Sequence, residues 1–308
     1  MTFRLSVTLL PLAVLASSCS VPRPQLASPA HPAACAPIPE AKIAAQTYNF
    51  VHDLLGSPAD NGTTPERLDA AFAALERAGF TNVEGFGETL GLSPNEYSAF
   101  AKKHHLRIVA GHGGLDEGSW STALARARAR GQELIGSAGF GPRGFNSLED
   151  TLATAAALNR LGEAASAQGL LFYVHNHAGE FETKFPYDLD GDGIAAPTSV
   201  WEIVAANTDP RFVHFEIDVH WARRGRGLDA FADLLAFLKR YRDRIVLLHV
   251  KGTAADGSFA DLEKGTTDWR AIFAAAGRGI RYYVWEHESG GDVAVAAKAA
   301  HRYLRCGR

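Results

Sequence analysis

Imidazole and carboxylate side chains follow several apolar segments of this sequence. The stretch LLFYVHNHAGEFE, residues 170–182, runs from apolar and aromatic residues into His175, His177 and Glu180. The segments FEIDVHW, LLHVKG and VWEHE end in the same way, and they add Asp218, His249, Lys251, Glu286 and Glu288. Mixed imidazole and carboxylate ligands favour Mn²⁺, Zn²⁺, Co²⁺ or Fe²⁺, whereas oxygen ligands alone favour Mg²⁺ or Ca²⁺. These residues therefore predict one divalent metal site.

The two-residue period of a strand separates neighbours within these segments. In EIDVH, the side chains of Glu216, Asp218 and His220 share one face. Asp218 is the inward-facing candidate ligand. Glu216 either lies deeper in the barrel or holds a ligand in place by a hydrogen bond. In WEHES, Glu286 and Glu288 also share a face, so periodicity does not choose between them.

The segments that carry these residues alternate with helical patterns along the chain. The strand-like segments cover residues 42–50, 81–87, 107–114, 133–140, 170–177, 211–221, 244–252 and 281–289. The helical patterns cover residues 64–80, 93–106, 121–132, 148–169, 199–209, 228–244, 267–279 and 293–305. Such alternation implies parallel strands joined by right-handed crossovers. Eight units in about 265 residues predict a (β/α)₈ TIM barrel, which typically takes about 250 residues. A doubly wound open sheet is the alternative, but no GxGxxG follows the first strand.

Active sites of (β/α)₈ barrels lie at the C-terminal ends of the strands. The polar residues at these ends should therefore meet at one mouth. The early strands add Glu84 and His112 as candidate substrate-binding residues. The segment HWARRGRG after the sixth strand adds Trp221 and Arg224, although a solvated loop beside the mouth is the simpler reading of its arginines.

Several of these segments together resemble the sugar phosphate isomerase/epimerase family of xylose isomerase-like TIM barrels. The motifs are YVHNHAGEF, FEIDVHW, LLHVKG and VWEHE, and the likeness extends to AAQTYNF and AGFTNVEGFG. It covers residues 41–305 and includes the HNHxxEF pattern of one subgroup. The resemblance implies a metal-dependent keto-sugar isomerase or epimerase of carbohydrate metabolism that works through a metal-stabilised enediolate.

The resemblance also implies roles for individual residues. A single divalent metal, preferably Mn²⁺, would be held by Asp218, His249, Glu286 and one ligand from the fifth strand. Glu180 matches the glutamate of the HNHxxEF pattern, and His177 competes with it for this position.

Catalytic and substrate-binding roles follow from the same resemblance. Proton transfer would fall to Glu180, His177 or Glu288. Lys251 and His112 would hold substrate oxygens, and His175 would line the substrate pocket. Relatives often carry an aspartate where this chain has Gly252, so the acid that orients Lys251 is missing or comes from elsewhere.

Other functions are weighed against this one. A lyase or dehydratase acting on a 3-keto sugar or related polyol would use the same enolate. A surface carbohydrate-binding protein without catalysis is a further alternative. An apurinic endonuclease shares the barrel but needs three metals and a basic track, and the formal net charge is −3 with a pI near 6.5. We therefore expect a small sugar or keto sugar as partner and no nucleic acid.

The first residues predict export. Arg4 precedes the apolar run LSVTLLPLAVLA, and the ending Ala-Ser-Ser-Cys19 resembles a bacterial lipobox, so residues 1–19 are expected to be a signal peptide. An ordinary cleaved signal and a cytosolic protein are the alternatives. Residues 20–40 are rich in Pro and Ala and predict a linker, which leaves residues 41–308 for the barrel. The protein is expected on the periplasmic side of a membrane, anchored only by a lipid on Cys19.

Two further features are weighed. Asp188, Asp190 and Asp192 have the spacing of the first half of a calcium loop, but Ser199 stands where the bidentate glutamate belongs, so we do not expect Ca²⁺ at 188–193. A turn-rich acidic insertion over the barrel mouth is predicted there instead. Cys35 and Cys306 could form a disulfide in an oxidising compartment, with two free thiols as the alternative.

Overall fold

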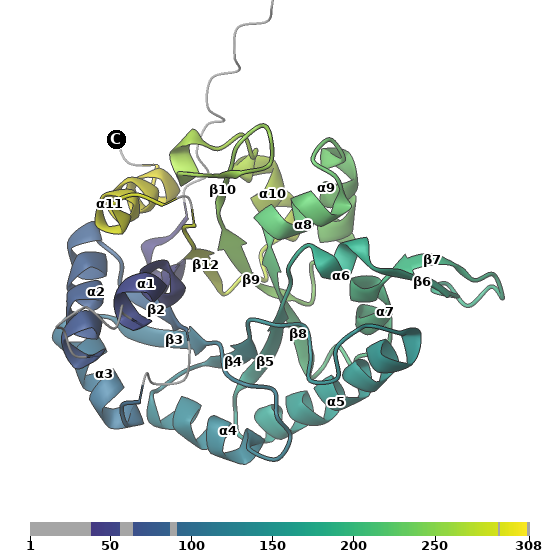
Figure 1. Ribbon diagram of the computed structural model, residues 1–308, viewed down its shortest axis with the longest axis horizontal. Coiled ribbons are helices and arrows are strands. Elements are labelled where there is room, and N and C mark those ends of the chain that lie inside the picture. The colour runs from purple at the N-terminus through teal and green to yellow at the C-terminus, as the bar shows by residue number, and fades with distance from the viewer. Residues whose placement is uncertain (1–37, 56–63, 87–90, 289, 307–308) are drawn as a thin grey trace, which may run out of the picture. The chain divides into compact units, whose positions relative to one another are not determined.

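A computed structural model describes residues 38–55, 64–86, 91–288 and 290–306 of the chain. Within these residues, eight parallel strands form a (β/α)₈ TIM barrel, as predicted (Figure 1). The strands are β1 (Ile43–Gln46), β2 (Asn82–Gly85), β3 (Arg107–Gly111), β4 (Leu134–Ser137), β5 (Leu171–His175), β8 (Val213–Asp218), β9 (Ile245–Val250) and β12 (Tyr282–Trp285).

Backbone hydrogen bonds join these strands into a ring. The pairing order is β3-β2-β1-β12-β9-β8-β5-β4. The two end strands, β3 and β4, meet through the Glu133 N–H, which donates to the Val109 carbonyl at 3.0 Å, and the Gly113 N–H, which donates to the Gly136 carbonyl at 2.8 Å. A barrel has no free sheet edge, so all eight C-terminal strand ends surround one opening.

Helices cover the outside of the barrel. The outer helices are α2 (Thr64–Ala78), α3 (Pro94–Lys103), α4 (Trp120–Ala129), α5 (Leu148–Ala167), α7 (Val200–Ala206), α9 (Phe231–Tyr241), α10 (Trp269–Ala276) and α11 (Val293–Leu304). Local signals explain where they begin: Ser93 and Glu96 form a capping box at the start of α3, with Pro94 in its first turn. None of the described helices is long and apolar enough to cross a membrane.

Shorter helices, turns and strands lie before β1 and in the segments that connect the barrel strands with the outer helices. They are α1 (Val51–Leu55), α6 (Gly179–Glu182), α8 (Val219–Arg226), the 3₁₀ turns η1 (Glu40–Lys42), η2 (Thr47–Phe50) and η3 (Leu262–Lys264), and the strands β6 (Lys184–Tyr187), β7 (Ala196–Ser199), β10 (Gly252–Thr253) and β11 (Phe259–Ala260). Several strands end earlier than the sequence predicts. The strand expected to reach residue 221 ends at Asp218, because its carboxylate accepts the Trp221 N–H at 2.9 Å and starts α8.

The core has two layers, as alternation along each strand requires. Phe172 and Val174 pack outward against the helices, whereas Tyr173 packs with Ala44 and Leu247 in the barrel interior. Neighbouring inward positions at the strand ends are polar, and they form the site described below.

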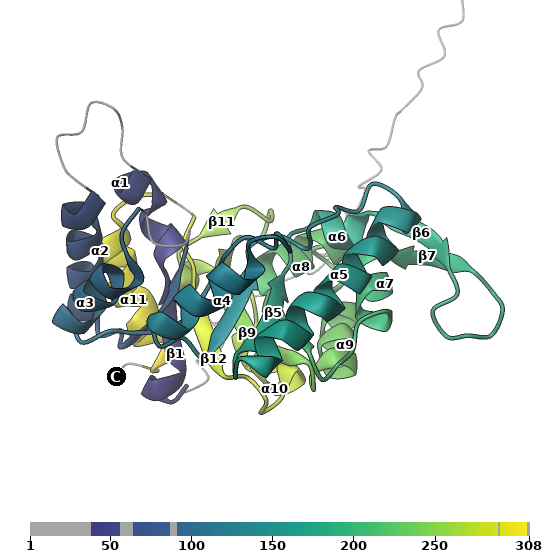
Figure 2. The same ribbon diagram turned by 90° about the horizontal axis from the view of Figure 1, so that it is seen from below.

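The acidic insertion lies away from the mouth. Strands β6 and β7 form an antiparallel hairpin that projects outward beyond α7 (Figure 2). At its tip, Asp188 accepts the N–H groups of Gly191 and Gly193, each at 2.8 Å, so its carboxylate closes the turn. Ser199 accepts the Glu202 N–H and caps α7. The expectation of an insertion over the mouth is therefore wrong, because the hairpin pairing carries the tip outward.

The two ends of the described chain meet at the N-terminal end of the barrel. Ile38 is buried, and its N–H donates to the Leu304 carbonyl at the end of α11 at 3.1 Å. Cys306 is disulfide-bonded. Its predicted partner Cys35, the signal sequence, Cys19 and almost all of the predicted linker lie outside the described residues.

Candidate metal centre and active site

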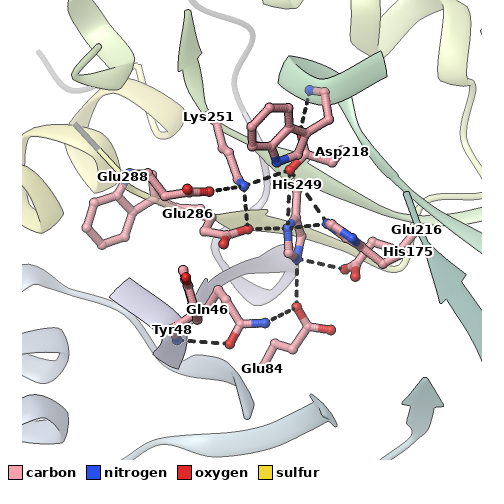
Figure 3. A network of polar contacts seen from close by, with 12 residues as sticks. Gln46, Tyr48, Glu84, His175, Glu216, Asp218, His249, Lys251, Glu286 and Glu288 are labelled. Atoms are coloured by element: carbon pink, nitrogen blue, oxygen red, sulfur yellow. Dashed lines mark hydrogen bonds and ion pairs between the residues drawn. The ribbon is translucent and has the colours of Figure 1, made fainter. Parts of the chain in front are cut away.

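Four strand ends bring four ligand atoms together at the mouth of the barrel. His175 ends β5, Asp218 ends β8, His249 lies in β9 and Glu286 follows β12 (Figure 3). His249 Nδ1 lies 3.1 Å from His175 Nε2 and 2.5 Å from Glu286 Oε2, and Asp218 Oδ2 lies 3.6 Å from His175 Nε2. All four ligand atoms lie within 4.8 Å of one another, and all four residues are buried.

The donor chemistry of this cluster fits a divalent metal. Asp218 Oδ2 and Glu286 Oε2 are buried, and neither accepts a well-aligned hydrogen bond. Buried carboxylate oxygens are costly unless a cation compensates them. Two imidazole nitrogens and two carboxylate oxygens suit Mn²⁺, Zn²⁺, Co²⁺ or Fe²⁺. The cluster is thus a candidate metal centre.

Lys251 supplies a positive charge to the same oxygens. Its Nζ lies 2.9 Å from Asp218 Oδ2, 3.1 Å from Glu286 Oε2 and 2.5 Å from Glu288 Oε1. Burial works against the ammonium form, but the three carboxylates outweigh it and raise the pKa of Lys251. Burial likewise opposes the ionised form of Glu286, yet Lys251 and His249 lower its pKa to about 2. The alternative to a metal centre is therefore a cluster whose carboxylates are compensated by Lys251 and His249.

A second layer of buried side chains holds His249 in place. Its Nε2 lies 2.8 Å from Glu84 Oε2 and 3.1 Å from Glu216 Oε1, which directs Nδ1 toward the cluster (Figure 3). Glu84 is held in turn by Gln46, whose Nε2 donates at 2.7 Å, and by the Tyr173 hydroxyl. A metal-binding histidine commonly donates its other N–H to a carboxylate in this way.

His112 completes this lower layer. Its Nε2 lies 2.9 Å from Glu216 Oε2 and 3.3 Å from Glu84 Oε1. Glu84, His112, Glu216 and His249 are close enough to form a second possible ligand group. Because these side chains already bond one another, we interpret them as the support of the upper cluster.

Burial keeps His175 neutral. Burial is the largest influence and lowers its pKa to about 4, although Asp218 opposes the shift. A neutral imidazole has a free lone pair, which a metal ligand needs. His249 differs from His175. Burial opposes the charged form of its imidazole, but Glu216 and Glu286 outweigh burial and hold the pKa of His249 well above its usual value.

Glu180, the predicted fifth-strand ligand, is placed elsewhere. It lies in α6, and its Oε2 accepts the His177 N–H at 2.9 Å. Burial raises the pKa of its carboxyl group. It does not belong to the ligand group, in which His175 occupies the fifth-strand position. Strand periodicity could have identified His175, because it shares the inward face of β5 with Tyr173.

A pocket of about 130 Å³ opens above the cluster. It is lined by Tyr48, Phe86, His112, Ala138, His175, His177, Trp221, His249, Glu286 and Glu288. Seven predicted site residues are thus brought to the pocket wall: His112, His175, His177, Trp221, His249, Glu286 and Glu288. Glu84 lies beneath the pocket in the support layer, and Arg224 stacks over the Trp221 ring with its Cζ 5.3 Å from the centroid.

The structure also explains Gly252. A Cβ at this position would collide with the carbonyl oxygens of Ala260, which pairs with Gly252 in β11, and of Asp261, which follows β11. The aspartate that relatives often carry here has no room. Lys251 is oriented instead by Asp218, Glu286 and Glu288.

Comparison with known proteins agrees with this fold. A sugar phosphate isomerase/epimerase from Parabacteroides distasonis is 24% identical, with a TM-score of 0.68 over 90% of this chain and 98% of its own. An L-ribulose 3-epimerase is 13% identical, with a TM-score of 0.61 over 87% and 94% of the two chains. A probable 3-DHS dehydratase from Bacillus anthracis is 15% identical, with a TM-score of 0.59 over 85% and 98%.

At these identities the likeness establishes the fold alone, and no curated protein matches the sequence. The family comparison goes further. Residues 72–305 match the family described as xylose isomerase-like TIM barrel, which is most of the barrel domain. The chain belongs to the xylose isomerase-like TIM barrel family.

Proposed function

We propose that this protein is a divalent-metal-dependent isomerase or epimerase that acts on a keto sugar. The observation that carries the proposal is the convergence of His175, Asp218, His249 and Glu286 at the barrel mouth, with two buried carboxylate oxygens that lack well-aligned hydrogen bonds. Similar folds in a sugar phosphate isomerase/epimerase and an L-ribulose 3-epimerase support the reaction class.

These four residues would hold the metal, with Mn²⁺ as the first candidate and Zn²⁺, Co²⁺ or Fe²⁺ as others. A divalent metal bound there would supply the positive charge that stabilises an enediolate when a proton beside a carbonyl is removed. We assign the fourth ligand to His175 rather than Glu180, because Glu180 caps the loop after β5.

Residues around the pocket would move the proton. Glu288 lines the pocket, and burial raises its pKa although Lys251 opposes the shift. A carboxyl group whose pKa lies nearer neutrality both accepts and returns a proton efficiently. His177 lines the same pocket, and burial lowers its pKa, so it is available as a neutral base. These two side chains are the proposed acid–base pair, and His112 would contact a substrate oxygen. Lys251 would act on the pocket through Glu288, whose Oε1 lies 2.5 Å from its Nζ.

The pocket chemistry favours a neutral sugar. Tyr48, Phe86 and Trp221 offer aromatic faces to the C–H groups of a sugar ring. No lysine or arginine is among the described residues that line this pocket, and Lys251 is already surrounded by three carboxylates. A phosphate group would therefore meet no lysine or arginine among these lining residues, so we propose a sugar without phosphate.

A lyase acting through the same enolate is the second candidate. The fold of a probable 3-DHS dehydratase is similar, and the contact between Lys251 and Glu288 could supply a proton to a departing hydroxyl group. Product analysis separates the two, because elimination releases water and creates a conjugated carbonyl with ultraviolet absorbance.

Metal content tests the proposal. We expect about one Mn²⁺, Zn²⁺, Co²⁺ or Fe²⁺ per chain by mass spectrometry, lost in Asp218→Ala, His249→Ala and His175→Ala. Glu180→Gln is the matched control and should keep its metal. Failure of the unaltered chain to bind any of these metals after reloading would reject the proposal and favour carboxylates compensated by Lys251 and His249. Loss of metal in Glu180→Gln but not in His175→Ala would reverse the ligand assignment.

We further propose export through residues 1–19, with lipid attachment at Cys19 on the periplasmic side. The basic start, the apolar run and the lipobox-like ending support it. Incorporation of labelled palmitate into the intact chain, lost in Cys19→Ser, would test it.

A further inference from the structure

A second cavity adjoins the pocket above the metal ligands. Its volume is about 370 Å³, and it shares two lining residues, Tyr48 and Glu288, with the smaller pocket. Its other walls come from α1, which supplies His52, and from the loop after β12, which supplies His287, Gly290 and Gly291. We call this space the side compartment.

The sizes of the two spaces indicate that a substrate extends beyond the first. The pocket above the cluster has about 130 Å³, which is less than the roughly 300–1,000 Å³ of most ligand pockets. The side compartment by itself falls within that range at about 370 Å³. A molecule whose reacting ring fills the small pocket can therefore place an attached group in the side compartment.

The loops that form the compartment are fixed by hydrogen bonds. The Asn49 side chain joins the segment after β1 to the segment after β12: its Oδ1 accepts the His287 N–H at 2.7 Å, and its Nδ2 donates to the Trp285 carbonyl at 3.3 Å. His287 Nε2 lies 2.9 Å from the Gly290 carbonyl oxygen. These contacts give the compartment a formed wall.

The lining suits a neutral group with hydroxyls. Apart from its histidines, the described lining of the side compartment has one acidic side chain, Glu288, and no lysine or arginine. Glu288 pairs with Lys251. Tyr48 and His52 offer a ring face and hydrogen-bonding atoms, as sugars require. Gly290 and Gly291 keep the space open, because no heavy atom lies within 4 Å of the position of a Cβ on either residue.

We propose that the side compartment is a second sugar subsite and that the substrate is a keto sugar carrying a further glycosyl group. The inference rests on the proposed function, since it assumes that the reacting keto-sugar ring binds at the metal ligands. It predicts that the enzyme prefers a disaccharide over the corresponding monosaccharide.

The test compares fructose with lactulose and isomaltulose, in which fructose carries a second sugar at different positions. Dissociation constants are measured by calorimetry on the full chain loaded with Mn²⁺. We expect at least one disaccharide to bind about fivefold or more tightly than fructose, since the second ring gains contacts in a formed pocket.

Filling the compartment should abolish this preference. In Gly291→Phe the ratio of the fructose to the disaccharide dissociation constant should return to about one. The matched control is Gly169→Phe, because Gly169 also has a positive φ, +75° against +85° at Gly291, and open space around it, but lies before β5 at the opposite end of the barrel. His52→Trp narrows the same compartment from α1 without altering a left-handed residue.

The outcomes separate the two proposals. Binding of fructose without a disaccharide preference would overturn the second subsite and leave the proposed function standing. A preference that survives both Gly291→Phe and His52→Trp would also overturn it. If the metal-loaded protein binds none of the three sugars, the proposed function fails, and the subsite fails with it.

Discussion

The contact between Glu84 and His249 makes a quantitative prediction. Glu84 Oε2 lies 2.8 Å from His249 Nε2, and both residues are buried. A hydrogen bond to a charged group contributes about 1.5–3 kcal/mol. The amide oxygen in Glu84→Gln could still accept this bond, but a charge-assisted bond is roughly twice as strong as a neutral one. The variant should therefore lose about 0.8–1.5 kcal/mol of support, which corresponds to a roughly four- to twelvefold higher Mn²⁺ dissociation constant.

The assay is competition for Mn²⁺ with a fluorescent chelator at fixed pH. Glu133→Gln is the control, because Glu133 is also a carboxylate that accepts a hydrogen bond, from the Tyr282 hydroxyl at 2.8 Å, but precedes β4 at the other end of the barrel. Its affinity for Mn²⁺ should stay unchanged. An unaltered dissociation constant in Glu84→Gln, or an equal loss in both variants, would refute the view that the lower layer orients His249 for a metal.

Three further predictions concern charge, pH and backbone packing. Lys251→Met leaves the carboxylates of Asp218 and Glu286 without their ammonium, so the metal-free protein should lose about 3–5 kcal/mol of unfolding free energy; urea titrations should show that Mn²⁺ restores more stability to the variant than it adds to the native chain. Burial lowers the pKa of His214, so the unfolded chain binds a proton below about pH 6.5 that the folded protein does not yet bind. Stability should therefore fall as pH drops below that value, and His214→Gln should fall less steeply. Gly252→Ala should cost about 1–3 kcal/mol and lower turnover, because the added Cβ meets backbone atoms beside Lys251; a melting temperature equal to that of the native chain would contradict this.

The fold was largely predictable because local patterns and topology agree. Alternating strand and helix segments identified the barrel, and the rule that strand ends meet at one mouth placed Asp218, His249 and Glu286 together. The residue that β5 adds to this cluster was harder to predict. The motif pointed to Glu180, but whether a side chain beyond a strand end points inward depends on the turn that follows, and here α6 begins and directs Glu180 to the His177 N–H.

Other features depend on contacts between distant segments. The pairing of β6 with β7 decides that the acidic turn points outward, and a run of aspartates does not reveal that pairing. The sequence suggested that Gly252 replaces a functional aspartate. The structure shows that the backbone of Ala260 and Asp261 leaves no room for a side chain there. The side compartment also requires the segments after β1 and β12 to lie side by side, which Asn49 secures across 238 residues of sequence.

The contact between Ile38 and Leu304 has a consequence for any attached form of this protein. Ile38 joins the barrel at the end opposite the ligand cluster, since β1 runs from there toward the mouth. A fusion partner joined directly before Ile38 would therefore meet the barrel at the end opposite the mouth. A barrel coupled to a resin directly before Ile38 should bind metal and sugar as tightly as the free protein does, because the attachment point and the mouth lie at opposite ends.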